Sequence, residues 1–290
     1  MTGFGRGIRG RPFGDALATG HIGGAGRGLS GGGRPQPAAE LGPAGPPVPA
    51  IDPVRRGPDS LAAHPPGHPM PIDLFATLRD LGLRPPRGVL QVGASYGQEM
   101  DQFVAHGIRA GVFIEPLPAP FQVLAAACRQ RPDFVAVNAL CGAKSGERVT
   151  FHVASNGGMS SSMLAPANHL TEFDFVSFDQ QVELVTHRLD DVLAFVAAQG
   201  HGTATGALDL LYMDTQGAEL QVLQGAEAAL ARLDVVFTEV TRHRMYDGAP
   251  TLDELMAFLA PRGFTLNNVN FDRHHHADAL FVRARALGMH

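Results

Sequence analysis

Short runs of β-branched and aromatic residues alternate with amphipathic windows of helical period from about residue 72 onward. Parallel strands need crossover connections, and helices are the usual crossovers, so this alternation predicts a mostly parallel sheet covered by helices on both faces. We expect an α/β domain with a doubly wound sheet over residues 71–290. The expected strands are 89–92, 111–114, 134–137, 208–213 and 235–240, and the expected helices are 98–106, 118–130, 189–199 and 218–231.

The C-terminal part of the chain departs from that alternation. After a further helix over 251–259, two strands at 265–270 and 279–282 are separated by a short polar segment, which permits only antiparallel pairing. A second hairpin-like pair, 148–153 and 181–186, frames a loop rich in glycine and serine. We therefore expect a sheet that ends in an antiparallel hairpin strand, whereas a dinucleotide-binding fold would continue with another crossover.

Residues 1–70 differ from the rest because glycine, proline and arginine dominate them without hydrophobic periodicity. Such a segment cannot offset its ordering entropy by burial, so we expect a disordered tail. Its arginines suggest RNA binding, but no aromatic residues alternate with them to stack on bases. Lys144 is the single lysine of the sequence, so arginine is the usual cation throughout this chain and its presence in the tail is not specific to RNA binding. Since the formal net charge is −5, we expect no nucleic-acid partner.

Two cysteines, Cys128 and Cys141, lack any CxxC spacing, which favours two inert thiols in a reducing compartment. No apolar run approaches the length that spans a bilayer, and the N-terminus lacks the apolar core of a signal peptide. We expect a cytoplasmic protein with no membrane span.

The stretch 88–99, GVLQVGASYGQE, is an apolar run that breaks into two closely spaced glycines. A strand that turns here into a helix presents backbone N–H groups at the carboxyl edge of the sheet, where α/β proteins bind ligands. Glycine would let a ligand approach the main chain closely, although glycine turns of this kind often only end a strand and have no role in binding. The expected ligand contacts are Gly93, Ala94, Ser95, Tyr96 and Gly97.

Polar residues also follow the next two expected strands. Glu115 and Pro116 end the second strand about twenty residues after the glycines, where a carboxylate can accept both hydroxyls of a ribose. Asn138 and Ala139 end the third strand, where they would lie beside an adenine. A glutamate at a strand end is often a solvated charge, but the order and spacing on three successive strands predict a nucleotide-type ligand.

The segment 208–230, LDLLYMDTQGAELQVLQGAEAAL, closely resembles the D-x-x-G-x-E-x-x-x-L-x-G hallmark of the FkbM family of S-adenosylmethionine-dependent methyltransferases. The resemblance extends over about 87–283, through the glycine turn, IEP, VNAL and the closing segment that begins TEVTRHRMYDG. The hallmark is filled here by Asp214, Gly217, Glu219, Leu223 and Gly225.

This resemblance implies a class I methyltransferase-like (Rossmann-like) fold, S-adenosylmethionine as cofactor, and methyl transfer, usually to a hydroxyl oxygen of a sugar, glycolipid or natural product. Gln91 stands where an acidic residue is frequent in the family. Its amide oxygen offers an acceptor for the methionine amine in place of a carboxylate.

Asp214 follows an apolar strand, so its charge is expected at the ligand edge of the sheet. It is a candidate for a cofactor contact and for a catalytic role. The alternative is that it caps a helix beginning at Gly217. Glu219 falls in the first turn of that helix, where a negative charge complements the helix dipole, so a structural role is at least as well supported there as a catalytic one.

Glu239 ends the fifth expected strand, and His243 and Tyr246 lie in the loop after it. These loops border the acceptor pocket in this fold, so the three residues are candidates to bind, orient or deprotonate a hydroxyl, with His243 the nearest in ordinary pKa to neutral pH. A lone histidine in a polar loop is also a common surface feature. Ser160, Ser161 and Ser162 lie in a loop that either closes over the cofactor or acceptor or is an ordinary connection.

The run of Arg273 and three histidines that ends at His276 suggests a metal, but adjacent residues of an extended segment point in alternating directions and cannot readily converge on one ion. We expect a polar hairpin loop and no metal. Two other functional classes stay open: a nicotinamide-dependent oxidoreductase, which would need a tighter G-x-G-x-x-G turn, and a non-catalytic nucleotide-binding protein, which would have no use for the Asp214 and Glu239 regions.

Overall fold

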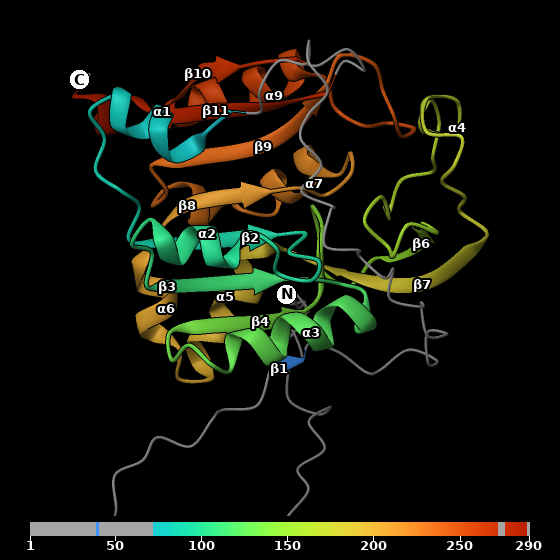
Figure 1. Cartoon of the computed structure of the whole chain (residues 1–290), viewed down its shortest axis with the longest axis horizontal. Helices are drawn as coiled ribbons and strands as arrows, with labels where there is room; N and C mark the ends of the chain where they lie inside the picture. The colour runs from blue at the N-terminus through green and yellow to red at the C-terminus, as the bar shows by residue number, and fades with distance from the viewer. Residues whose placement is uncertain (1–38, 41–71, 272–275, 289–290) are drawn as a thin grey trace, which may run out of the picture.

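An eight-stranded sheet forms the centre of the protein in the computed structural model, which describes residues 39–40, 72–271 and 276–288 (Figure 1). The strand order is β1-β4-β3-β2-β8-β9-β11-β10. The described pairings in this sheet are parallel except for those that β11 makes with β9 and β10. The strands are β1 (Ala39–Glu40), β2 (Gly88–Val92), β3 (Ala110–Ile114), β4 (Phe134–Asn138), β8 (Leu208–Met213), β9 (Val235–Thr241), β10 (Phe264–Val269) and β11 (His276–Arg283).

This arrangement confirms the predicted class I methyltransferase-like fold with one antiparallel strand near the C-terminus. Each strand of the predicted parallel set lies within a residue or two of its expected position. β10 lies one residue before its expected position, whereas β11 is longer than expected and begins at His276, which the sequence placed in a loop. The rest of that loop, 272–275, lies outside the described residues.

Helices cover both faces of the sheet, and Figure 1 shows α1, α2 and α3 in front of it and α5 and α6 behind. Successive side chains of each buried strand point to opposite faces of the sheet, so both faces are apolar and both need covering. Val89, Leu210 and Phe237 belong to the apolar cluster on one face, whereas Leu90 and Leu211 belong to the cluster on the other. The helices of the first cluster are α1 (Leu74–Asp80), α2 (Met100–Ala105) and α3 (Pro118–Cys128). Those of the second include α5 (Leu189–Ala198), α6 (Gly202–Ala207) and α9 (Leu252–Leu259).

The single helix expected over 218–231 is wrong, because the structure has α7 (Glu219–Gln224) and α8 (Glu227–Leu230) there. A Cβ at Gly225 would lie 2.2 Å from the carbonyl oxygen of Gly142, so this close backbone contact requires glycine. The second helix then starts afresh, with Asp190 of α5 accepting hydrogen bonds from two backbone N–H groups of its first turn. The break therefore depends on residues distant in the sequence.

A smaller sheet of order β5-β7-β6 lies beyond the carboxyl ends of the parallel strands (Figure 1). It contains β5 (Leu140–Cys141) and the predicted pair β6 (Arg148–Val153) and β7 (Gln180–His187). The loop between β6 and β7 includes the short helix α4 (His169–Glu172). Neither β5, α4, α1 nor α6 was expected from the sequence.

The predicted tail, 1–70, lies outside the described residues except for Ala39–Glu40. These two residues form β1, which pairs in parallel with Val137 and Asn138 of β4. A strand was not expected there, and disorder of the remaining tail stays a prediction.

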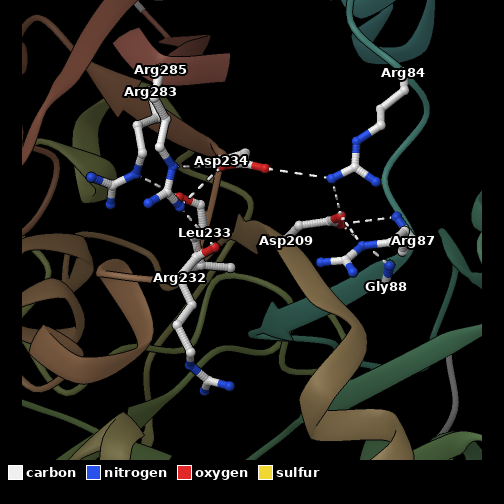
Figure 2. Close-up of polar contacts among 9 residues, drawn as sticks. All are labelled: Arg84, Arg87, Gly88, Asp209, Arg232, Leu233, Asp234, Arg283 and Arg285. Carbon is white, nitrogen blue, oxygen red and sulfur yellow. Dashed lines mark hydrogen bonds and ion pairs between the residues drawn. The ribbon is translucent and has the colours of Figure 1, made fainter. Parts of the chain in front are cut away.

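Charged residues at the amino edge of the sheet, opposite its carboxyl ends, bind the strand starts together, as Figure 2 shows. Asp209, whose side chain is 5% exposed, accepts from the backbone N–H groups of Arg87 and Gly88 and from Arg87 Nε at 2.9 Å. Arg84 lies 3.7 Å from Asp209 and 3.8 Å from Asp234. We call Arg84, Arg87, Asp209, Asp234 and Arg285 the amino-edge cluster, since Arg285 pairs with Asp234 at 3.2 Å.

Cys128 and Cys141 are free and buried, which confirms the prediction of two inert thiols. Burial raises the pKa of each thiol to about 12. In 39–40, 72–271 and 276–288, no helix has the length and apolar character that crossing a membrane requires.

Candidate functional site

The order of the strands reverses between β2 and β8, because the chain moves outward through β3 and β4 before it returns to β8. In doubly wound folds, ligands bind in the crevice at the carboxyl ends on either side of such a switch point. A pocket lies there, and we call it the carboxyl-edge pocket. Its walls include the predicted cofactor residues Gln91, Gly93, Ser95, Glu115, Pro116, Ala139 and Asp214.

The glycines of the turn are required by neighbouring protein atoms. Gly93 has a φ of +79°, and a Cβ there would lie 1.8 Å from the carbonyl oxygen of Asp214. Gly97 also has a φ of +79°, and a Cβ would lie 3.0 Å from the side chain of Leu124. Packing of the protein therefore already favours glycine at both positions, because β2 approaches β8 and the turn approaches α3. Close approach of a ligand to these glycines stays a prediction.

The remaining predicted residues of the turn hold it in place. Ala94 is fully buried and donates its backbone N–H to the carbonyl of Ile114 at 2.9 Å. The Tyr96 hydroxyl donates to the carbonyl of Gly157 at 3.2 Å and so ties the turn to the serine loop. Ala94, Tyr96 and Gly97 are not wall residues of the carboxyl-edge pocket.

Glu115 lies at the tip of β3, as predicted, and is 6% exposed. Its Oε1 accepts from the N–H of Leu117 at 2.8 Å, and its Oε2 accepts from the N–H of Ser95 at 2.9 Å. Burial raises the pKa of this carboxyl to about 7, although the two backbone hydrogen bonds oppose the rise. Further hydroxyl donors from a ligand would favour the ionised form.

Gln91 is 1% exposed and points into the same pocket. Its Nε2 donates to Oε2 of Glu99 at 2.8 Å. Its Oε1 is buried and accepts no hydrogen bond from the described residues. A buried amide oxygen without a donor is costly, so this atom is suited to a donor group on a bound ligand.

Asn138 connects the ends of two strands. Its Nδ2 donates to the carbonyls of Glu115 at 2.8 Å and Pro116 at 3.0 Å. Asn138 is not a wall residue of the carboxyl-edge pocket, whereas the next residue, Ala139, is. The asparagine thus fixes the loop that carries Glu115.

Asp214 and Glu239 are brought together by one amide group. Nε2 of Gln216 donates to Oδ1 of Asp214 at 2.6 Å and to Oε2 of Glu239 at 3.0 Å. Asp214 remains accessible at the pocket wall, yet protein atoms crowd its carboxyl, and this desolvation, followed by the charge of Glu239, raises its pKa well above the usual range. Gln216 has a φ of +53°, an uncommon conformation for a residue with a side chain.

The alternative role of Asp214 as a helix cap is wrong. The N-cap of α7 is Ala218, and no side chain of the described residues caps it. Glu219 supports the preceding loop instead, because its Oε1 accepts from Thr215 N at 3.2 Å, Thr215 Oγ1 at 3.1 Å and Gly217 N at 3.1 Å. Burial raises the pKa of Glu219 to about 7.

A second pocket, much smaller than the carboxyl-edge pocket, lies next to the end of β9, and we call it the β9 pocket. Its walls include Gln216, Glu239, Tyr246 and His276, and Gln216 also lines the carboxyl-edge pocket. The Tyr246 hydroxyl lies 2.8 Å from both Gln216 Oε1 and the carbonyl oxygen of Ser160. Two of the predicted acceptor residues, Glu239 and Tyr246, thus meet at one pocket.

The three serines are engaged in the packing of their own loop. Oγ of Ser160 accepts from Asn156 at 2.9 Å, and Oγ of Ser161 accepts from the N–H of Ala154 at 2.9 Å. Ser162 donates its hydroxyl to the carbonyl of Gln216 at 2.7 Å. Of the three, Ser161 is a wall residue of the carboxyl-edge pocket.

His243 is exposed and is a wall residue of neither the carboxyl-edge nor the β9 pocket, whereas His276 lines the β9 pocket. Nδ1 of His276 lies 3.2 Å from Oε1 of Glu239. Sequence reasoning missed this residue because it assigned the histidine run to a loop. Residues 276, 278 and 280 lie on one face of β11, and Leu280 is buried on that face. This period of two is the signal that could have placed His276 in a strand.

The sheet order, the switch point and the pocket beside it are those of the class I S-adenosylmethionine-dependent methyltransferases. The Methyltransferase FkbM domain matches residues 91–266, more than half of the chain, so the chain belongs to the FkbM methyltransferase family. It is 27% identical over 186 residues to the 2-O-methyltransferase NoeI of Sinorhizobium fredii (strain NBRC 101917 / NGR234), which covers 61% of this chain and 72% of NoeI.

Solved methyltransferase structures resemble the chain more distantly. The magnesium protoporphyrin IX methyltransferase ChlM of Synechocystis PCC 6803 has a TM-score of 0.40 at 10% identity, over 72% of this chain and 76% of ChlM. A SAM-dependent methyltransferase of Aquifex aeolicus has a TM-score of 0.37 at 12% identity, over 73% and 89%. These TM-scores are too low to support an inference.

Family membership makes the protein an enzyme, a methyltransferase whose cofactor is S-adenosylmethionine. The carboxyl-edge pocket fits this cofactor, because the buried Oε1 of Gln91 suits its ammonium group and the carboxylate of Glu115 suits its ribose hydroxyls. The match is to a methyltransferase domain, so the oxidoreductase alternative has no support.

Proposed function

We propose that the chain transfers a methyl group from S-adenosylmethionine to a hydroxyl oxygen of a sugar, glycolipid or natural product. The FkbM domain match and the similarity to a 2-O-methyltransferase support O-methylation. The bound cofactor would supply an electrophilic methyl group on its sulfonium sulfur. The observation that carries the proposal is the buried Oε1 of Gln91, an acceptor without a donor in the pocket that also contains Glu115.

In this proposal, different residues of the carboxyl-edge pocket bind different parts of the cofactor. Gln91 accepts from the methionine ammonium, and Glu115, with Pro116 beside it, accepts from the ribose hydroxyls. Ser95 and Ala139 line the space between them. Gly93, Ala94, Tyr96, Gly97 and Asn138 act indirectly, because they position the backbone and the carboxylate that make the contacts.

The acceptor hydroxyl lies beside Gln216, where the carboxyl-edge pocket and the β9 pocket adjoin. Asp214 and Glu239 present two carboxyl groups around the Gln216 amide, and Tyr246 adds a hydroxyl at 2.8 Å from that amide. Two carboxyl groups and a phenol can hold the hydroxyls of a polyhydroxylated acceptor at fixed angles. Such alignment of the acceptor oxygen with the methyl carbon supplies a large part of the acceleration in reactions of this type.

Isothermal titration with S-adenosylmethionine, S-adenosylhomocysteine and NAD tests the proposal. We expect both sulfur ligands to bind and NAD not to bind. A matched pair of variants locates the site: Gln91→Leu should weaken binding of both sulfur ligands, whereas Gln181→Leu, on β7 and outside both pockets, should not. Binding of NAD without binding of S-adenosylmethionine would refute the proposal.

Three further points extend the proposal. The acceptor is a small molecule or glycan, since the two pockets lie together at one edge of the sheet. No nucleic-acid partner is needed for this reaction. A cytoplasmic location, predicted from the sequence, agrees with two free buried thiols.

A further inference from the structure

A histidine of the last strand is hydrogen-bonded to the acidic residue at the end of β9. Nδ1 of His276 lies 3.2 Å from Oε1 of Glu239. The other oxygen of this carboxyl, Oε2, accepts from Gln216 at 3.0 Å. Because Glu239 is bonded through both oxygens, it can hold the imidazole ring in one orientation.

This hydrogen bond determines which ring nitrogen carries the proton. A carboxylate can only accept, so Nδ1 of His276 donates to Glu239. In a neutral imidazole the lone pair is then on Nε2. That is the tautomer in which a histidine accepts a proton from a substrate.

The ring lies on the acceptor side of the site. His276 and Glu239 line the β9 pocket, and Gln216 lines both this pocket and the carboxyl-edge pocket. The His276 side chain is 20% exposed, and Phe173 packs edge-on against it with 5.5 Å between ring centroids. An acceptor hydroxyl beside Gln216, where the two pockets adjoin, would have the imidazole on the side of the β9 pocket and the methyl donor on the side of the carboxyl-edge pocket.

We propose that His276, oriented by Glu239, is the general base that takes the proton of the acceptor hydroxyl, an inference that rests on the proposed function. The acceptor oxygen forms a bond to the methyl carbon while the bond from that carbon to sulfur breaks and its electron pair stays on sulfur. The hydroxyl proton passes to Nε2. The products are the methyl ether, S-adenosylhomocysteine and an imidazolium, which Glu239 stabilises until the proton leaves to solvent.

Other groups near the site are less suited to this task. His243 is exposed and outside both pockets. Burial raises the pKa of the Tyr246 phenol well above its usual range, so its phenolate is scarce at neutral pH. Burial, followed by the charge of His276, lowers the pKa of His169, which packs against Tyr246 with 5.5 Å between ring centroids.

Several charged or titratable groups of the described residues surround the pair. His276 is faced by Glu239 of β9 and by His169 of α4. Behind Glu239 lie the carboxyl groups of Asp214, Glu219 and Asp278. Burial raises the pKa of each of these three carboxyl groups, and those that are ionised favour the imidazolium that forms as the proton is transferred.

Nitrogen NMR of the full chain, labelled with ring-¹⁵N histidine, tests the pair without an acceptor. The His276 signals are assigned by their loss in His276→Gln. We expect the neutral ring with its proton on Nδ1, and we expect Glu239→Gln to lower the apparent pKa of His276 by about 1. A proton on Nε2, or a His276 titration that Glu239→Gln does not move, overturns the proposal.

Methyl transfer from labelled S-adenosylmethionine to methyl glycosides of common hexoses, used as probe acceptors, gives the kinetic test. We expect His276→Gln to lower kcat about 100-fold or more and to abolish the acidic limb of its pH profile, with cofactor affinity and melting temperature unchanged. His201→Gln, a histidine before α6 at the amino side, is the matched control. Full transfer by His276→Gln, or a loss in His243→Gln alone, overturns the proposal.

Failure of the proposed function and failure of this inference give different experimental results. If S-adenosylmethionine does not bind to the unaltered chain, the proposed function fails. If it binds and the NMR result is contrary, this inference alone fails. When none of the probe glycosides is methylated, the tautomer and the response to Glu239→Gln still decide for or against the pair.

Discussion

We predict that Glu115→Gln removes a pH dependence from the binding of S-adenosylmethionine. Glu115 is buried, and burial raises its pKa to about 7 against the hydrogen bonds from Leu117 and Ser95. Ribose hydroxyls that donate to this carboxyl bind its ionised form better than its protonated form. The cofactor should therefore lower the pKa of Glu115.

The direction and the size of the pH effect on cofactor affinity follow from this fall in the pKa of Glu115. Below pH 7 the free protein holds a proton that the complex gives up, so binding releases protons and affinity rises with pH. Above about pH 7 the carboxyl is ionised in both states and affinity is level. A fall of the pKa from about 7 to about 5 corresponds to about 2.7 kcal/mol, and affinity at pH 5 should be on the order of 50-fold weaker than at pH 8.

Calorimetric titrations at pH 5, 6, 7 and 8, each in two buffers of different ionisation enthalpy, measure both the affinity and the protons released. Glu115→Gln should bind more weakly at pH 8 and show little change of affinity with pH. Asp278→Asn is the matched control, because burial also raises the pKa of Asp278, to about 6, but this residue is not a wall of the carboxyl-edge pocket. Equal affinity of the unaltered chain at pH 5 and pH 8, or an unchanged pH dependence in Glu115→Gln, would refute the reasoning.

Three further predictions concern stability and turnover. Asp209→Ala should lower the free energy of unfolding by about 3 kcal/mol, because it leaves the N–H of Gly88 and the Arg87 side chain without their acceptor; a loss below about 0.5 kcal/mol in urea denaturation would contradict this. Gly225→Ala should destabilise by about 2 kcal/mol or more, since its Cβ would lie 2.2 Å from the Gly142 carbonyl oxygen; an unchanged thermal midpoint would disprove the close contact. Asp214→Asn should reduce methyl transfer at least about 100-fold at an unchanged melting temperature, and full activity would exclude Asp214 from the site.

The parallel strands could be predicted because a strand buried on both faces has a short apolar sequence that is bounded by turns. The run before Gly93 and the run before Asp214 are both of this kind, and their carboxyl ends meet at the pocket. Glu115 and Gln91 could be placed for the same reason, since a position at or near a strand end fixes the edge to which a side chain belongs.

Features that depend on contacts between distant residues could not be predicted. The end of α7 at Gly225 depends on the carbonyl of Gly142, and Gly93 is required by the carbonyl of Asp214. The role of Asn138 depends on its hydrogen bonds to the carbonyls of Glu115 and Pro116, which follow the neighbouring strand β3. His276 was missed for a related reason, because its pairing with Glu239 requires the register of β11 against β9.

A crystal structure of the full chain with S-adenosylhomocysteine tests the central claim most directly, because it locates the ligand atoms. The account predicts ligand density in the carboxyl-edge pocket, with both ribose hydroxyls within hydrogen-bonding distance of Glu115, the amino group at Oε1 of Gln91, and the sulfur facing Gln216. A ligand bound elsewhere, or bound with its ribose away from Glu115 and its amino group away from Gln91, would contradict it.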